Sequence, residues 1–301
     1  MPRCTRCRQS ITNNMEEYYY RIYGLTVKTN VPLTLLAETD AAPEDLSIRV
    51  EYGAVQKSYD IRVLEDDGVY RVNLGMLADF RIYPERGLME CTAEDYNGFF
   101  STLFNIPFSI FFAVRSLRLL HCCAMTYKEK LICLAGEKGV GKSTVTSILN
   151  GGDFRLFSDD SLLISDDGRG YKPHNLIKMT ESTVKFSRKN AIMLTDCFNA
   201  VGKRYGVFDG EEESRDIAAV LVLRRTSGTP DLREVTGETV RRMSFLNNTI
   251  GISYFPRELL RKWLDVPACP SVKLYDAFIP NDYENLEENV CGLERMIKEI
   301  F

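Results

Sequence analysis

The chain has 301 residues, of which 45% are hydrophobic and 27% are charged. These values are ordinary for a folded globular protein, and they exclude long disorder, a collagen-like repeat and a multi-span membrane protein. With 38 Lys and Arg against 42 Asp and Glu, the formal net charge is −4, which argues against a protein that coats nucleic acid or an anionic membrane. The only two histidines, His121 and His174, lie too far apart for a zinc site built on paired histidines.

Nine cysteines are an odd number in a chain much longer than disulfide-rich secreted scaffolds. We therefore expect reduced thiols and a cytoplasmic protein. Cys4 and Cys7 form a CxxC pair, but no second CxxC completes a four-thiolate zinc site. We expect residues 1–17 to be a poorly ordered leader, as chain ends often are.

From Tyr18 the pattern becomes typical of β-strands. Runs rich in β-branched and aromatic residues occupy 18–29, 46–52, 58–74 and 79–83. Asp67-Gly68 separates two such runs and predicts a hairpin turn. We interpret residues 18–90 as a small β-rich N-terminal domain.

Helical patterns follow between residues 92 and 120. Thr92 is the expected N-cap of a first helix, and Pro107 is expected to divide the apolar stretch into two helices. The most hydrophobic window, 99–114, is short and contains polar residues, so we expect buried core helices rather than a membrane span.

The rest of the chain alternates strand and helix patterns, and we assign residues 91–301 to a second, catalytic domain. A strand is expected at 131–135, and a second strand region is expected to end at residue 164. A hairpin turn is expected after it, at Asp166-Asp167-Gly168. The continuous apolar run IAAVLVL at 217–223 predicts a central strand covered on both faces. Helices are expected at 143–149, 237–247, 257–264 and 284–300.

The glycine-rich turn after the strand at 131–135 carries the main motif of the chain. Its sequence GEKGVGKS fits GxxxxGK[ST] at every fixed position and stands between a strand and a helix, as that motif requires. Glycines let the backbone wrap a phosphate with its N–H groups inward, and the helix presents its positive N-terminus to the same anion. We expect Lys142 to reach the β- and γ-phosphates and Ser143 to bind Mg²⁺. The residues predicted to bind the nucleotide are Gly136, Glu137, Lys138, Gly139, Val140, Gly141, Lys142, Ser143 and Thr144.

Two adjacent carboxylates, Asp159 and Asp160, follow Ser143 after an interval just long enough for a short helix and one strand. Two neighbouring carboxylates can have different roles: one can bind a metal ion while the other deprotonates an acceptor hydroxyl. Asp-Asp also occurs at 66–67 and 166–167, where turn roles suffice. The spacing, and not the dipeptide, therefore carries the interpretation.

The segment LHCCAMTYKEKLICLAGEKGVGKSTVTSILNGGDFRLFSDDSLLI resembles the core of the HPr kinase/phosphorylase family, a distant relative of the phosphoenolpyruvate carboxykinase fold. The resemblance covers residues 119 to about 180. It implies an α/β (α+β) fold with a P-loop catalytic domain built on a mixed central sheet. It also implies that Asp159 is the general base, that Asp160 is associated with the metal and that His121 lies near the reacting phosphate. His121 is equally compatible with a satisfied histidine at the end of a buried helix.

The identity of the phosphate acceptor rests on a second resemblance. The chain lacks the Glu-Ile-Arg-Gly-like loop that HPr kinase uses with its protein substrate, so a different acceptor is expected. The N-terminal half, YYRIYGLTVKTNVPLTLL followed by LSIRVEY, is similar to stand-alone kinases of lasso peptide biosynthesis. Those kinases phosphorylate the C-terminal Ser of a precursor peptide. Lys178, Lys203 and Arg204 are candidates for contacts to the substrates.

The sequence therefore predicts a kinase that uses Mg²⁺ and ATP, or GTP, to phosphorylate a hydroxyl of a peptide or small protein. Two alternatives stay open: a nucleotide-gated regulatory NTPase that signals through the N-terminal unit, and a kinase acting on free serine. We expect neither nucleic acid nor a membrane as a partner. The oligomeric state is open, and a homo-oligomer is compatible with the sequence.

Overall fold

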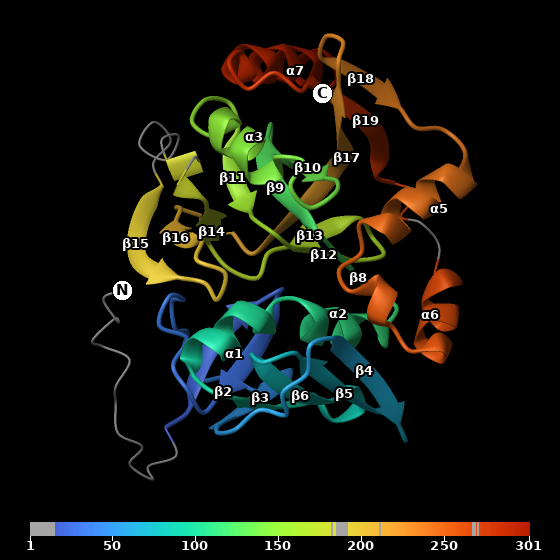
Figure 1. Ribbon diagram of the computed structural model, residues 1–301. Helices are drawn as coiled ribbons and strands as arrows, with labels where there is room; N and C mark the ends of the chain where they lie inside the picture. Colours follow the sequence, from blue (N-terminus) through green and yellow to red (C-terminus); the bar gives the residue numbers. More distant parts are fainter. Residues whose placement is uncertain (1–15, 182, 185–191, 211, 267–268, 270) are drawn as a thin grey trace.

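The computed structural model describes residues 16–181, 183–184, 192–210, 212–266, 269 and 271–301 (Figure 1). The leader expected at 1–17, with Cys4 and Cys7, lies outside these residues except for its last two positions.

Seven strands near the N-terminus form one sheet, in the spatial order β1-β2-β3-β7-β6-β5-β4. The pairs β2/β3 and β3/β7 are parallel, and the other neighbours are antiparallel. Asp67 and Gly68 both have positive φ between β4 and β5, as a two-residue hairpin turn requires, so the predicted turn is confirmed. The strands are β1 (Tyr18–Ile22), β2 (Leu25–Thr29), β3 (Leu46–Tyr52), β4 (Ile61–Asp66), β5 (Val69–Leu74), β6 (Ala78–Tyr83) and β7 (Leu88–Ala93).

Two short helices, α1 (Tyr96–Leu103) and α2 (Ile106–Ala113), cover one face of this sheet and separate it from the rest of the molecule (Figure 1). Pro107 stands in the first turn of α2, as expected. The prediction that Thr92 is the N-cap of this helix is wrong, because Thr92 belongs to β7. Asp95 caps α1 instead, and its side chain accepts a hydrogen bond from the Gly98 N–H at 2.8 Å. The boundary expected near residue 90 thus falls inside β7, and the helices after it share the hydrophobic core of the first sheet.

Every residue of α2 is buried, so the hydrophobic window is part of the core, as predicted. Among the described residues, no helix combines the length and the apolar character that crossing a membrane would need.

A second, mixed sheet has the path β11-β9-β10-β17-β13-β12-β8, with β19 paired to β17 and β18 to β19. The run predicted as a central strand is the middle of β17, which pairs in parallel with both β10 and β19. The hairpin predicted at 166–168 joins β12 to β13. The strands are β8 (Arg118–Leu120), β9 (Cys122–Tyr127), β10 (Lys130–Ala135), β11 (Arg155–Ser158), β12 (Leu162–Ile164), β13 (Arg169–Tyr171), β17 (Ser214–Thr226), β18 (Asp231–Glu234) and β19 (Lys273–Pro280).

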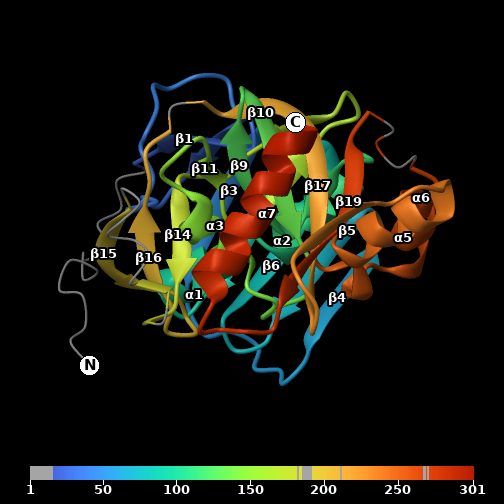
Figure 2. The same cartoon turned by 90° about the horizontal axis from the view of Figure 1, so that it is seen from above.

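Helices cover the second sheet. On one face, Val145 and Leu149 of α3 (Lys142–Leu149) pack with Val290 and Leu293 of α7 (Leu286–Ile300), and Figure 2 shows α7 crossing the strands from above. The opposite face packs against Phe245 of α5 (Glu238–Asn247). α6 (Arg257–Leu264) follows α5 and contributes to the first core instead. The described residues also include two short 3₁₀ helices, η2 (Pro84–Arg86) and η3 (Ile252–Tyr254).

A small antiparallel sheet, in the order β14-β16-β15, stands beside the second sheet (Figure 1). It consists of β14 (Leu176–Met179), β15 (Met193–Phe198) and β16 (Arg204–Val207). β14 is the strand that matters for the site, because it carries Lys178.

The thiols agree with the expectation of reduced cysteines. Within the described part of the chain, no disulfide involves Cys91, Cys122, Cys123, Cys133, Cys269 or Cys291, and Cys122, Cys123 and Cys133 are completely buried in β9 and β10. They pack there as small apolar side chains.

The contact between the first sheet and its helices predicts a stability effect. Phe108 of α2 is completely buried and contacts the rings of Tyr23, Phe104 and Phe112. Because truncation leaves a cavity in a packed core, we expect Phe108→Ala to lower the free energy of unfolding by about 3–5 kcal/mol. Urea titration followed by circular dichroism measures this. The control, Leu64→Ala at a side chain that is 64% exposed, should change it by less than about 0.5 kcal/mol, and equal effects would contradict the prediction.

Candidate functional site

The glycine-rich motif that the sequence predicts to bind phosphate forms the loop between the end of β10 and the start of α3, and we call it the phosphate loop. Gly136, Gly139 and Gly141 have φ of 137°, 89° and 103°, a region that L-residues rarely adopt. Gly141 is the residue immediately before α3, so the loop leads directly into the positive end of that helix. The loop thus has the strand, turn and helix arrangement that presents backbone N–H groups to a phosphate.

The loop is held from inside by Lys142. Its ammonium group donates hydrogen bonds to the carbonyl oxygens of Gly136 at 2.8 Å and Glu137 at 3.2 Å. The side chain is buried, whereas Glu137, Lys138 and Gly139 are exposed at the rim. Val140, Ser143 and Thr144 are half-buried. All nine predicted nucleotide residues therefore lie in the loop and the first turn of α3, and Lys142 ties the end of the loop to its first two residues.

Asn248, just after α5, connects the phosphate loop to His121 through hydrogen bonds. The sequence alone did not predict a role for this residue. Its amide oxygen accepts a hydrogen bond from the Gly136 N–H at 2.7 Å. Its backbone carbonyl accepts one from the N–H of His121, also at 2.7 Å. One residue therefore fixes both the start of the phosphate loop and the histidine.

Asp159 follows directly after β11 and meets the end of the phosphate loop. Its Oδ1 accepts hydrogen bonds from the hydroxyl of Ser143 at 3.0 Å and from the thiol of Cys123 at 2.9 Å. Its Oδ2 accepts one from the Lys178 N–H at 2.9 Å. The side chain is only 2% exposed, and burial together with the neighbouring charge of Asp160 raises the pKa of Asp159 above its ordinary value.

Asp160 has a different set of partners from Asp159. It has a φ of +70°, which turns the chain sharply between the two carboxylates. Its oxygens lie 2.8 Å from the ammonium nitrogen of Lys178 and 3.4 Å from Nε2 of His121. Burial would raise the pKa of Asp160, but Lys178 and then His121 outweigh it and hold the pKa well below the usual value.

Of the three predicted basic residues, the structure brings only Lys178 to this cluster. It binds Asp159 through its backbone and Asp160 through its side chain. Burial lowers the pKa of Lys178, but Asp160 outweighs burial and the net shift is upward. Arg204 pairs with Asp196 at 3.1 Å on β15, and Lys203 lies in the turn between β15 and β16. Within the described residues, neither bonds to Asp159 or Asp160.

The first sheet reaches the Asp pair through the turn between β1 and β2. Tyr23 is buried there, and its hydroxyl lies 2.7 Å from the Ser161 hydroxyl, one residue after Asp160. The Tyr23 N–H donates to the Lys172 carbonyl at 2.9 Å. Ser161 is held from its other side, because its carbonyl accepts a hydrogen bond from the Ser158 hydroxyl at 2.7 Å. The N-terminal unit therefore touches the loop that carries both carboxylates.

His174 lies near the cluster but has a different environment from His121. Its ring stands edge-on to Phe104 with a centroid distance of 4.6 Å, and its Nδ1 accepts a hydrogen bond from the Leu176 N–H. Burial lowers the pKa of His174 to about 3. It is therefore neutral at physiological pH and supports the start of β14.

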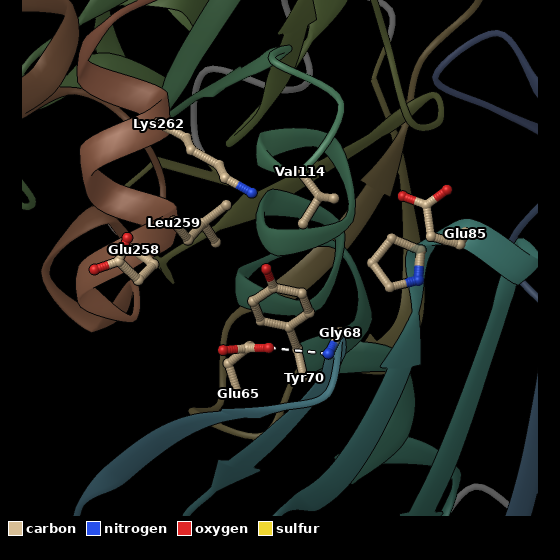
Figure 3. Close-up of a pocket in the computed structure, with 9 residues that line it drawn as sticks. Glu65, Gly68, Tyr70, Glu85, Val114, Glu258, Leu259 and Lys262 are labelled. Atoms are coloured by element: carbon tan, nitrogen blue, oxygen red, sulfur yellow. Dashed lines mark hydrogen bonds between the residues drawn. The ribbon is translucent and has the colours of Figure 1, made fainter.

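A separate cavity of about 200 Å³ opens between the hairpin of β4 and β5 and helix α6 (Figure 3). Its lining residues are Glu65, Gly68, Tyr70, Pro84, Glu85, Val114, Glu258, Leu259 and Lys262. None of them belongs to the phosphate loop or the Asp pair, and the cavity has no part in the chemistry proposed below.

No protein-family model matches the chain, and no curated protein matches it. Among solved structures, the HPr(Ser) kinase/phosphatase from Coxiella burnetii matches with a TM-score of 0.32 and 12% sequence identity. The match covers 61% of this chain and 99% of that chain. The structural likeness is remote.

The lysine between the two carboxylates predicts a pH-dependent stability. The folded-state pKa of Asp160 is depressed, so its ion pair stabilises the fold above the unfolded pKa of about 4 and ceases to do so as pH falls through the folded pKa. In buffer without divalent cations, we expect the substitution Lys178→Met to lower the free energy of unfolding by about 1–2 kcal/mol at pH 7. The loss should shrink as pH falls below about 4.

Urea midpoints at pH 7, 5, 4 and 3 measure this difference. Lys298→Met is the matched control, because Lys298 also bridges two carboxylates, Asp153 and Glu294, but at the surface. That variant should lose clearly less stability than Lys178→Met does at pH 7, because surface ion pairs contribute little. A loss for Lys178→Met that grows between pH 7 and pH 3 would show that Asp160 is not the group involved, because protonation of Asp160 can only reduce the loss.

Proposed function

We propose that this protein is a kinase that transfers the γ-phosphate of ATP, with Mg²⁺, to a hydroxyl of a peptide or small protein. One observation carries the proposal. The hydroxyl of Ser143, at the end of the phosphate loop, is hydrogen-bonded to the buried carboxylate of Asp159, and Asp160 stands beside it. The end of the glycine-rich loop thus meets one of two adjacent carboxylates, and this contact supports a site for phosphoryl transfer.

The donor set fits Mg²⁺. Among the described residues no cluster of three or more His, Cys, Asp or Glu side chains could hold a metal ion alone. Mg²⁺ rarely needs one, because it is usually bound by one or two carboxylates, substrate phosphates and water. Ser143 and Asp160 offer that kind of oxygen set. When bound, Mg²⁺ neutralises charge on the β- and γ-phosphates.

Asp159 is proposed as the general base. Its raised pKa makes it a better proton acceptor than an ordinary exposed carboxylate. It takes the proton of the acceptor hydroxyl as that oxygen bonds to the γ-phosphorus, the bond from this phosphorus to the bridging oxygen breaks and ADP leaves. Lys142 compensates negative charge on the transferring group. Asp160, proposed as the metal-associated carboxylate, stays ionised because of Lys178 and His121.

The acceptor is proposed to be a seryl hydroxyl, such as the C-terminal Ser of a lasso precursor peptide. The support is the sequence similarity of the N-terminal half to peptide kinases. A second candidate, a nucleotide-gated NTPase, is favoured by a specific contact: Tyr23 links the N-terminal sheet to the loop of the Asp pair. Movement at the site would be transmitted to that sheet.

An acceptor screen separates these functions. Purified protein is incubated with Mg²⁺ and γ-labelled ATP in the presence of a synthetic peptide ending in Ser, the same peptide ending in Ala, or free serine. Label on the Ser peptide alone supports the proposal. Labelled serine would indicate a small-molecule kinase, and labelled free phosphate without either product would indicate the NTPase.

Two variants then separate chemistry from nucleotide binding. We expect Asp159→Asn to lower the transfer rate about 10²- to 10⁴-fold, because the general base is lost, while nucleotide affinity and the Mg²⁺ concentration for half-maximal rate stay unchanged. Lys142→Ala should weaken nucleotide binding as well. Isothermal titration calorimetry and initial rates measure the two effects.

The control is Asp67→Asn, at an exposed carboxylate in a hairpin turn, which should transfer phosphate at the wild-type rate. Wild-type transfer by Asp159→Asn would overturn the role of Asp159. A large rise in the Mg²⁺ requirement of Asp159→Asn would instead assign that residue to the metal.

A further inference from the structure

The carboxyl ends of β17 and β19 lie beside the phosphate loop, on the side away from the Asp pair. β10, which leads into the loop, pairs with β9 on one side and with β17 on the other, and β19 follows β17. The Asp pair comes directly after β11, which pairs with β9. Ligands of open α/β sheets bind outside the carboxyl ends of the strands. A nucleotide whose terminal phosphate points to the Asp pair therefore extends its nucleoside over β17 and β19.

Arg225, near the end of β17, joins this region to the phosphate loop. Its Nε donates to the carbonyl of Val140 at 2.9 Å, and another guanidinium nitrogen donates to the carbonyl of Pro280 at 3.2 Å. A side chain at Gly141 would place its Cβ 2.5 Å from the guanidinium, so the glycine permits this close approach. The guanidinium is thus fixed between the loop and the end of β19.

Tyr283 lies in the segment between β19 and α7 and places its ring over this guanidinium. The carbon at the centre of the guanidinium is 5.5 Å from the ring centroid, within the range of a cation–π contact. The ring is nevertheless 69% exposed. The segment itself is ordered by Asp282, which accepts hydrogen bonds from the Glu284 and Asn285 N–H groups at 3.0 and 3.3 Å. An exposed aromatic ring is therefore held in a defined place beside the phosphate loop.

We propose that Tyr283 and Arg225 form the binding site for the base of the nucleotide, with Tyr283 supplying a face on which a purine stacks. This inference rests on the proposed function, since it concerns the nucleotide of the same site. Stacking tolerates different bases because every base has a π-face. The nearby carboxylate of Asp282 is occupied by its own turn, since it also accepts from the Asn285 side chain at 2.8 Å. ATP and GTP are therefore expected to bind with affinities within about tenfold of each other.

The test compares a nucleotide with a probe that lacks the nucleoside. Dissociation constants for MgATP and for inorganic tripolyphosphate with Mg²⁺ are measured by calorimetry on the full chain. Tyr283→Ala should weaken MgATP binding roughly 5- to 100-fold and leave tripolyphosphate binding unchanged. Tyr283→Phe, which keeps the ring, should bind MgATP as wild type does. Tyr59→Ala, at a fully exposed tyrosine just before β4, is the control and should change neither constant.

The outcomes distinguish the subsite from the proposed function. If Tyr283→Ala binds MgATP as tightly as wild type, or if it weakens both probes equally, the subsite is overturned. If wild type binds tripolyphosphate and MgATP equally well, the subsite is overturned and the phosphate site stands. Wild type that binds neither probe would overturn both.

Discussion

The site depends on keeping two adjacent carboxylates out of bulk water, Asp159 buried and Asp160 half-buried. Taking a carboxylate out of water costs several kcal/mol unless charges or hydrogen bonds compensate it. Lys178 compensates both, through its N–H to Asp159 and its ammonium to Asp160. The positive φ of Asp160 turns the second side chain away from the first, so each finds its own partners. The small sheet of β14, β15 and β16 thus has a clear role, because β14 delivers this lysine.

The same constraint explains why the N-terminal sheet is close to the site. The loop after β11 contains Asp160, whose positive φ is unfavourable for a residue other than glycine. Such a conformation persists only where the surrounding structure stabilises it. Ser158 holds Ser161 from within the second sheet, and Tyr23 holds it from the first. Tyr23 is in turn packed against Phe108 and Phe112 of α2. The first sheet, its helices and the Asp loop therefore form one continuous set of contacts.

Local features of the sequence predicted local structure well. The glycine-rich turn between a strand and a helix, the hairpin turns and the division near Pro107 depend on neighbouring residues, and the structure has each of them. The prediction that Thr92 caps a helix was wrong because Thr92 pairs with Asp79 of β6 as part of β7, and residues next to Thr92 in the sequence do not indicate this pairing. Asn248, Arg225 and Tyr23 could not be found from the sequence. Each reaches the site from a distant part of the chain, through a strand order that no local pattern encodes.

The two carboxylates differ because their surroundings differ, although they are neighbours in the chain. Asp159 is surrounded by neutral donors, a hydroxyl, a thiol and a backbone N–H, and these do not offset burial and the charge next to it. Asp160 faces an ammonium group and an imidazole, which favour its ionised form. Environments that push two pKa values apart are how one site provides both a proton acceptor and a permanent negative charge. The anion of Asp160 helps to raise the pKa of Asp159, and Lys178 keeps that anion charged, although the hydrogen bond from the Lys178 N–H acts on Asp159 in the opposite direction.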